Sequence, residues 1–261
     1  MPRAQDKLQD LISTAWQLYA VELTTHGSPA LHPSIPLLWF GDLERYRESR
    51  PKVITVSYNP SRSEFPNHSP FQRFPAAANL GDKCVNGADV QAYTKSLNDY
   101  FKTCPYDWFD AYDLVLGGIS SSYYRPETAI DSTALHTDFC TPLATDPTWG
   151  KLKGHFQSHK DRLHRDGSRL WRKLVDFLAP DAILASISTS YRDEICGHAK
   201  GTPFFETTSE KGNINRVLAY RPFGSDGPVL IWARYVNGPF GAVPIRVKPE
   251  LGREIKARFL P

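Results

Sequence analysis

The sequence predicts an α/β fold of three layers, α/β/α, around a central and mainly parallel sheet. Short segments rich in β-branched and apolar residues alternate with longer segments of helical periodicity, which is typical of a parallel sheet covered by helices. Two of the strand candidates stop at a turn that contains a proline. The 261 residues are 41% hydrophobic, enough for one sizeable core. We therefore expect a single domain over residues 1–261, with its core at about residues 40–245.

The amino-terminal residues 4–24 carry apolar side chains at helical spacing, and Gly27-Ser-Pro ends the run. We expect an amphipathic helix there, as an extension of the core. The strands follow later, and the turn Gly224-Ser-Asp-Gly227 separates the last two. The expected strands are Val53–Ser57, Ala134–Cys140, Asp181–Ile187, Val217–Tyr220 and Val229–Val236.

Helices are expected between these strands. Apolar residues share one face from Ala88 to Lys102, and Asp110–Ile119 is a shorter apolar element. Ser168 is expected to cap a helix that ends before Pro180. The tripeptide Ser188-Thr-Ser190 is expected to open another helix, and Pro249–Phe259 to form the last one.

The net charge of +3 is unevenly distributed. The segment 151–173 holds eight Lys or Arg residues and two Asp, a local charge of +6, so the rest of the chain carries −3. One concentrated basic segment favours a local contact with a polyanion. A solvated loop would carry the same charges.

The composition gives no indication of a membrane, a metal or a cofactor. No run of about 18 apolar residues is present, and Asp6 and Asp10 interrupt any signal-peptide pattern, so we expect a cytoplasmic protein. The four cysteines include no Cys-x-x-Cys pair. No Cys or carboxylate convincingly completes a metal-ligand set with His155, His159 and His164. We expect reduced thiols, no cofactor and a monomer.

The chain is organised around the stretch Pro51-Lys-Val-Ile-Thr-Val-Ser-Tyr-Asn-Pro-Ser61. It presents Asn59, a polar side chain that cannot ionise, at the carboxyl end of a buried strand, where α/β folds place their chemistry. A long loop rich in Pro, Phe, Ser and Asn follows as far as Asn79, and such loops are usually functional or disordered. A plain turn at Asn59-Pro60 is the alternative.

Four segments carry motifs in a fixed order. Ser57-Tyr-Asn-Pro-Ser61 ends the first strand, and Pro70-Phe71 lies in the loop that follows. Thr137-Asp138 ends the second strand, and Leu174–Ile187 reads as helix, Ala-Pro and strand. Together, over roughly residues 40–245, they resemble the motifs of the uracil-DNA glycosylase superfamily, closest to its branches with Asn-Pro in the first motif. The resemblance implies an enzyme that flips a base out of DNA and hydrolyses its N-glycosidic bond.

The resemblance also implies roles for single residues. Asn59 would hold the attacking water, and Tyr58 and Phe71 would contact the flipped base, Phe71 by stacking. Phe65 and Phe74 compete for the stacking role, and any of the three rings would serve equally as a core aromatic. The family carries a catalytic His before its last conserved Pro, where this chain has Asn237-Gly-Pro-Phe-Gly241. Asn237 is therefore the candidate for assisting the departing base.

Asp138 and Ser61 indicate which base is read. The family's reader is an Asn, which both donates and accepts, whereas an ionised Asp only accepts and suits a base with an exocyclic amine, such as cytosine. Ser61 stands where uracil-specific members carry a bulky Tyr that crowds the C5 position. The two residues together favour a cytosine substituted at C5. A helix-capping or ion-paired Asp138 is the alternative.

Contacts with the DNA backbone are assigned to residues near the mouth of the site and in the basic segment. Hydroxyl and N–H groups at a strand-to-helix junction can bind phosphate, although ordinary N-capping explains them equally well. Phe240 is the candidate wedge that fills the gap left by the flipped base. The assigned DNA-binding residues are Arg62, Lys160, Arg162, Arg165, Ser188, Thr189, Ser190 and Phe240.

The sequence thus predicts a monofunctional DNA glycosylase that leaves an abasic site. No Lys adjoins the motif residues, so Schiff-base lyase chemistry is not expected. Modified cytosines of this kind, hydroxymethylated or glucosylated, occur in phage DNA, so a defence role is an expectation from this specificity. The alternatives are a uracil or mismatch-repair glycosylase and a catalytically silent DNA-binding member. A nucleotide-binding protein is disfavoured because a Gly-rich phosphate loop is missing.

Overall fold

The computed structural model describes residues 4–83, 87–103, 105–124, 132–208, 212 and 214–260. The strands are β1 Val53–Ser57, β2 Ser121–Ser122, β3 Ser132–Thr133, β4 Leu135–Asp138, β5 Ala182–Ala185, β6 Thr202–Thr208, β7 Ile214–Tyr220 and β8 Val229–Trp232.

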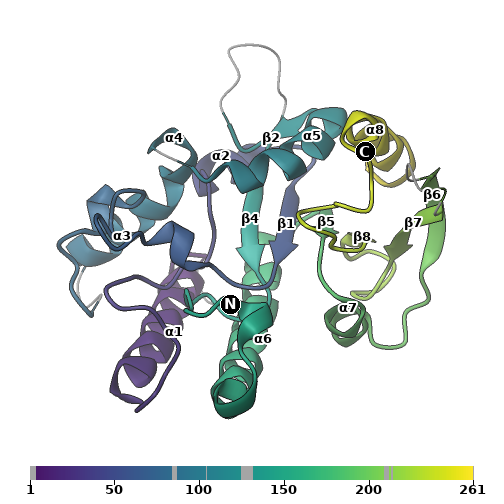
Figure 1. Cartoon of the computed structure of the whole chain (residues 1–261). Helices are drawn as coiled ribbons and strands as arrows, with labels where there is room; N and C mark the ends of the chain where they lie inside the picture. Colours follow the sequence, from purple (N-terminus) through teal and green to yellow (C-terminus); the bar gives the residue numbers. More distant parts are fainter. Residues whose placement is uncertain are drawn as a thin grey trace. The chain divides into compact units, whose positions relative to one another are not determined.

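Six of these strands form the central sheet, in the order β4-β1-β5-β8-β7-β6 (Figure 1). β5 pairs in parallel with both β1 and β8, whereas β7 pairs antiparallel with both β8 and β6. The two short strands β2 and β3 pair in parallel with each other. A mainly parallel six-stranded sheet flanked by helices confirms the predicted α/β class and is consistent with three layers.

The chain divides into two compact units. The first comprises Met1–Gly41, Tyr58–Tyr106 and Thr137–Leu178, and the second Asp42–Ser57, Asp107–His136 and Ala179–Pro261. Five strands of the central sheet belong to the second unit, and β4 runs from the second unit into the first. The single domain expected from the sequence stays a prediction.

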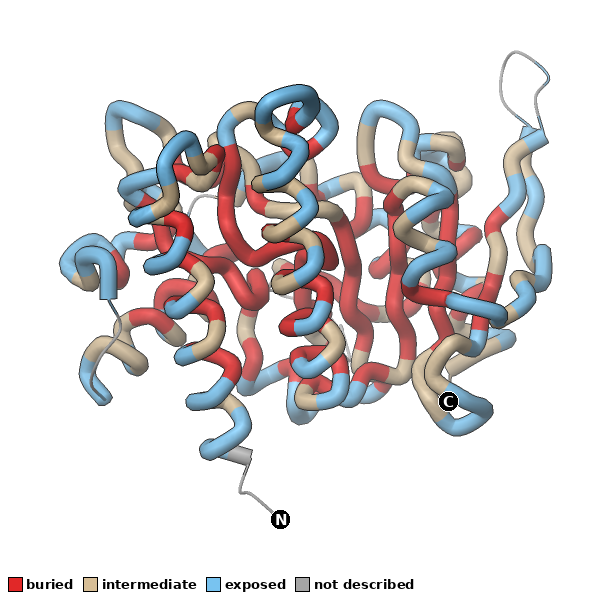
Figure 2. The backbone as a smooth tube through the Cα atoms, turned by 90° about the horizontal axis from the view of Figure 1, so that it is seen from below, coloured by how far each residue is buried: buried red, intermediate tan, exposed pale blue. Residues whose placement is uncertain are grey.

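The strands at the middle of the sheet are buried over their whole length because both of their faces are covered, and they are apolar except for Thr55 and Ser57 of β1. β1, β5 and β8 are buried at every position (Figure 2). Their register sets Val53 opposite Ala182, and Ala182 opposite Val229. β1 therefore ends at Ser57, as predicted, and the chain leaves the sheet at Tyr58.

The helices agree with the sequence pattern in most places. Residues 4–24 and Asp110–Ile119 form helices with the predicted bounds, and the last helix begins one residue early. The helices are α1 Ala4–Thr24, α2 Leu43–Glu48, α3 Gly87–Asn98, α4 Tyr100–Thr103, α5 Asp110–Ile119, α6 Gln157–Leu178, α7 Thr189–Cys196 and α8 Lys248–Phe259.

α1 is part of the packing of the first unit. It lies against α6, and Leu11, Ile12, Ala15, Trp16 and Tyr19 are buried along one side of it. In the second unit α5 and α8 cross closely at two glycines. A Cβ atom on Gly118 would come within 2.2 Å of the Pro249 carbonyl oxygen, and one on Gly252 within 2.1 Å of that of Val115. Small residues at the crossing allow this approach.

The structure corrects three expectations. The helix predicted from Ala88 to Lys102 is two helices, α3 and α4. β6 was not expected, because a polar edge strand that contains Pro203 lacks the apolar pattern of a central strand. Ser168 does not cap a helix, since it lies in the middle of α6 and its hydroxyl donates to the Arg165 carbonyl at 3.4 Å.

The pair Gly167-Ser168 resembles a helix start in the sequence, but α6 continues through it. Gly167 has a different role, which its neighbours show. A Cβ atom at this position would lie 2.2 Å from the Cys140 carbonyl oxygen and 2.5 Å from Thr141 Cα. Gly167 is thus a site of close approach between α6 and the segment that follows β4. Tertiary packing, and not a helix end, accounts for this glycine.

Two of the four cysteines can be described. Cys140 and Cys196 are free and buried, as reduced thiols would be, whereas Cys84 and Cys104 lie outside the described residues. None of the helices in the described part of the chain combines the length and the apolar character needed to cross a membrane.

Candidate functional site in the first unit

The turn after β1 and the end of β4 lie together in the first unit. The Cys140 N–H donates to the Tyr58 carbonyl at 2.8 Å, which joins the two segments just beyond their strands. Ser61 and Thr145 form an isolated parallel bridge a few residues further along. Asn59 therefore follows the carboxyl end of a buried strand, as predicted.

The side-chain amide of Asn59 has a defined orientation. Its Nδ2 donates to the carbonyl oxygens of Pro60, at 2.8 Å, and Leu143, at 3.2 Å. Thr145 Oγ1 lies 3.0 Å from the same nitrogen. Because two carbonyl oxygens can only accept, the amide must present its nitrogen to them. Within the described residues no donor reaches Oδ1, so this oxygen remains an acceptor for a bound molecule such as water.

Ser61 begins a short 3-10 helix, Arg62–Glu64. Its Oγ accepts from the Ser63 N–H at 3.2 Å, so the small side chain folds back onto its own turn. The side chain is partly exposed. A residue that folds back in this way occupies less of the space beyond the turn than a Tyr would.

Asp138 is the last residue of β4 and is only 6% exposed. The preceding Thr137 accepts a hydrogen bond from the Trp171 indole of α6 at 3.1 Å, which fixes the end of the strand within the unit. Asp138 therefore holds its carboxyl group in a nearly water-free place, where hydrogen bonds are stronger than in water.

A second buried carboxyl group, Glu64, was not predicted. Its side chain is 5% exposed, and Oε2 accepts from the Tyr100 hydroxyl at 2.7 Å and lies 3.8 Å from Arg73 Nε. Burial raises the pKa of Glu64 to about 7, the Tyr100 hydrogen bond and the Arg73 charge oppose the rise, and the charge of Asp138 adds to it. In the sequence Glu64 is one charged residue in a polar loop, so only its position among aromatic residues could have indicated burial.

Three phenylalanines were candidates for stacking on a base. Phe65 and Phe74 are buried and stack on each other, with ring centroids 5.2 Å apart, and Phe74 stacks on Tyr100 in turn. Phe71 is partly exposed and meets Phe65 edge-on at 6.4 Å. Of the three, only Phe71 has a ring that a ligand can reach without rearrangement of the core.

The basic residues assigned to DNA differ in whether their side chains already have partners within the protein. Arg162 binds Glu22, a residue 4% exposed, through two hydrogen bonds of 2.9 and 3.0 Å. Arg62 pairs with Asp146 at 2.7 Å, and Lys160 lies over the Trp149 ring at 5.1 Å. Arg165 pairs with its neighbour Asp166, and its side chain is largely exposed. Arg162 thus has a structural partner, whereas Arg165 is accessible.

The second unit holds the remaining predicted residues. Ser188 precedes α7, and its hydroxyl lies 2.9 Å from that of Ser190 without capping the helix. Thr189 and Ser190 are exposed. Asn237 is exposed too, and its backbone adopts a φ of 54°, which is uncommon for a residue other than glycine.

The prediction that Phe240 is a wedge is wrong. Its side chain is fully buried and packs edge-on against Tyr112 with ring centroids 5.7 Å apart. The Phe240 N–H donates to Ser186 Oγ at 2.9 Å. The buried amine of Lys248 donates to the Pro239 carbonyl at 2.8 Å. Phe240 therefore anchors the 237–241 segment in the core of this unit, and a wedge would need an exposed side chain.

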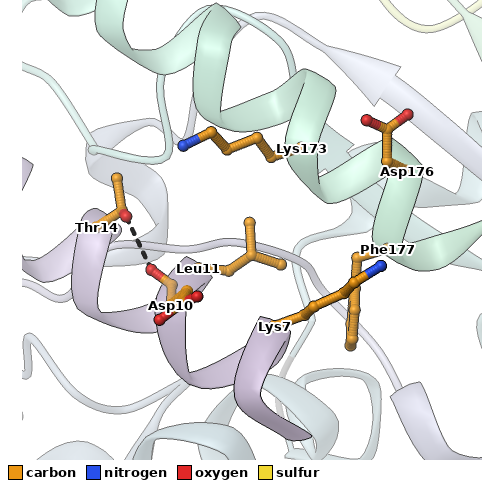
Figure 3. A pocket seen from close by; sticks show the side chains of 7 residues that line it. All are labelled: Lys7, Asp10, Leu11, Thr14, Lys173, Asp176 and Phe177. Carbon is orange, nitrogen blue, oxygen red and sulfur yellow. Dashed lines mark hydrogen bonds between the residues drawn. The ribbon is translucent and has the colours of Figure 1, made fainter. Parts of the chain in front are cut away.

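A groove of about 260 Å³ lies between α1 and α6 of the first unit (Figure 3). Lys7 and Asp10 line it from α1, and Lys173 and Asp176 from α6. The groove is therefore lined by charges of both signs. None of the site residues predicted from the sequence lines it. In the described residues, no three His, Cys, Asp or Glu side chains gather as metal ligands would.

No protein-family model matches the chain, and no curated protein matches it in sequence.

Proposed function

We propose that this protein is a monofunctional DNA glycosylase that excises a C5-substituted cytosine. The observation that carries the proposal is the orientation of Asn59: its amide nitrogen is held by two main-chain carbonyls, which leaves Oδ1 as an acceptor. An oxygen in this position can accept a hydrogen bond from a water molecule and direct it at the sugar C1′. DNA as the partner, a cytoplasmic location and a monomeric state belong to the same proposal.

In the proposed reaction the bond between C1′ and the base nitrogen breaks, and its electron pair leaves with the base. The water held by Asn59 forms the new C–O bond at C1′ and loses a proton to the surrounding water, from which the departing base anion takes up a proton. Asn59 cannot take that proton, so it positions the water and does not act as a base. An enzyme of this kind depends on a leaving base that is well bound. The role predicted for Asn237 in assisting the base stays a prediction.

The choice of base rests on Asp138. An ionised Asp138 would only accept, which matches the exocyclic amine of cytosine, whereas the carbonyl of uracil at the same position is another acceptor and would face it without a hydrogen bond. The small Ser61, whose hydroxyl turns back onto its own turn, is compatible with a substituent at C5. These two side chains support a modified cytosine over uracil.

The test is to incubate the protein with oligonucleotides that contain uracil, cytosine, 5-hydroxymethylcytosine or glucosylated 5-hydroxymethylcytosine. Alkali then cleaves the strand at any abasic site. We expect cleavage at a modified cytosine and little at uracil. Release of uracil alone would favour the repair alternative, and binding without cleavage on every substrate would favour a silent DNA-binding protein.

A further inference from the structure

The loop 61–74 carries two of the proposed base-binding residues, Ser61 and Phe71, and it is held mainly by successive turns. The Phe65 N–H donates to the Arg62 carbonyl at 2.9 Å, and the Phe74 N–H donates to that of Phe71 at 3.0 Å. Bonds of this kind shape the loop, and its first two residues are fastened to the rest of the unit by the bridge between Ser61 and Thr145 and by the ion pair of Arg62 with Asp146. The position of the remainder depends on the side chains that reach into the core.

Three side chains of the loop are buried, Glu64, Phe65 and Phe74, and of these Glu64 is the polar one. It reaches Tyr100 of α4 through a 2.7 Å hydrogen bond and Arg73, at the far end of the loop, through a 3.8 Å ion pair. Arg73 in turn donates to the Ser63 carbonyl at 3.1 Å. The carboxyl group thus joins the beginning of the loop, the end of the loop and a helix. Phe65 and Phe74 complete the anchor with their stacked rings.

We propose that Glu64 is a positioning residue for the base-binding loop, and that its proton state sets how often the loop opens. The part that concerns base binding rests on the proposed function, whereas the opening of the loop does not. The groups that face Glu64 are Tyr100, Arg73 and Asp138.

The direction follows from proton linkage. In the closed loop the pKa of Glu64 is raised to about 7 by burial, whereas an opened loop returns the carboxyl group to water and to its usual value of 4.5. The closed form then binds a proton that the open form has lost, between these two values. Raising the pH through this range favours opening by about tenfold per pH unit, and above pH 7 both forms are ionised and the effect levels off.

Backbone hydrogen exchange of residues 62–74 measures this opening directly. After correction for the intrinsic rate, we expect opening in the wild type to rise about 40-fold between pH 5 and pH 7 and to reach a plateau about one pH unit higher. Glu64→Gln keeps the shape of the side chain and removes the titration, so its opening should not change with pH. A flat profile in the wild type, or the same slope in both proteins, would overturn the proposal.

Two further variants test the inference even if Glu64→Gln does not fold. Asp138→Asn removes a charge that raises the pKa of Glu64, so the plateau should begin at a lower pH. Tyr100→Phe removes a hydrogen bond that lowers it, so the plateau should begin at a higher pH. Shifts in the opposite directions would contradict the mechanism. Because exchange is measured without substrate, a failure of the proposed function leaves this test intact.

If the protein is a glycosylase, the same titration should appear in its kinetics. KM for the modified base should rise between pH 5 and pH 7 in the wild type and stay constant in Glu64→Gln, with little change in kcat. A role in stability alone would not produce a KM that follows the proton on one side chain.

Discussion

Replacing Asn59 with Asp tests the orientation of its amide. The change adds a charge and is otherwise isosteric, but it places an oxygen where Nδ2 now faces the Pro60 carbonyl at 2.8 Å and the Leu143 carbonyl at 3.2 Å. Two hydrogen bonds, each with a net value of about 1 kcal/mol, are lost, and the carboxylate repels both acceptors. We therefore expect Asn59→Asp to lower the free energy of unfolding by roughly 2–4 kcal/mol at pH 8.

The penalty should shrink in acid. Protonation restores one donor, so the introduced carboxyl has a pKa in the folded state above its value of about 3.9 in the unfolded chain. The folded state then binds the proton more tightly, and stability falls as the pH rises from the unfolded to the folded pKa. Urea unfolding at pH 4 and pH 8 measures the difference. The exposed Asn79→Asp in the same loop is the matched control and should change little. If Asn59→Asp is as stable as the control at pH 8, the amide is not oriented by these carbonyls.

Three further predictions concern packing, DNA binding and base choice. Gly167→Ala should destabilise the protein by about 3 kcal/mol or more in thermal unfolding, because the new Cβ meets backbone atoms that cannot move aside, whereas Gly150→Ala, in open space, should not. Arg162→Ala should lower the free energy of unfolding by about 3 kcal/mol, because the buried Glu22 loses its cationic partner and keeps the hydrogen bond from Ser28. Arg165→Ala should leave stability unchanged and reduce the slope of log affinity for DNA against log salt by about one. Equal effects of the two variants would refute the distinction. Asp138→Asn should shift preference from modified cytosine toward uracil by roughly tenfold or more in competition assays, and unchanged selectivity would remove the base-reading argument.

The sequence was most informative where the local pattern and the tertiary environment agree. The strand Val53–Ser57 and its stop at Asn59-Pro60 follow from β-branched residues and a proline, and the structure has both. The burial of Phe240 could not be predicted, because a Pro-Phe pair in a turn is compatible with an exposed ring and with an anchor.

The roles of Glu64 and Gly167 could not be predicted from the sequence. A charged residue in a polar loop is exposed in most proteins, whereas Glu64 is buried and hydrogen-bonded to Tyr100, the ring on which Phe74 stacks. Gly167 resembles a helix boundary, whereas its role is the approach of α6 to the Cys140 carbonyl. Both roles arise from contacts between distant segments, which periodicity does not report.

The central claim is that Asn59 positions the water that releases a modified cytosine. Mass spectrometry of the base set free in a single turnover, from an oligonucleotide with glucosylated or plain 5-hydroxymethylcytosine, tests it most directly. We expect the intact modified base from the wild type, a rate lower by about 100-fold or more for Asn59→Ala with DNA binding retained, and no loss for the control Asn79→Ala. No released base from any substrate, or undiminished release by Asn59→Ala, would contradict the account.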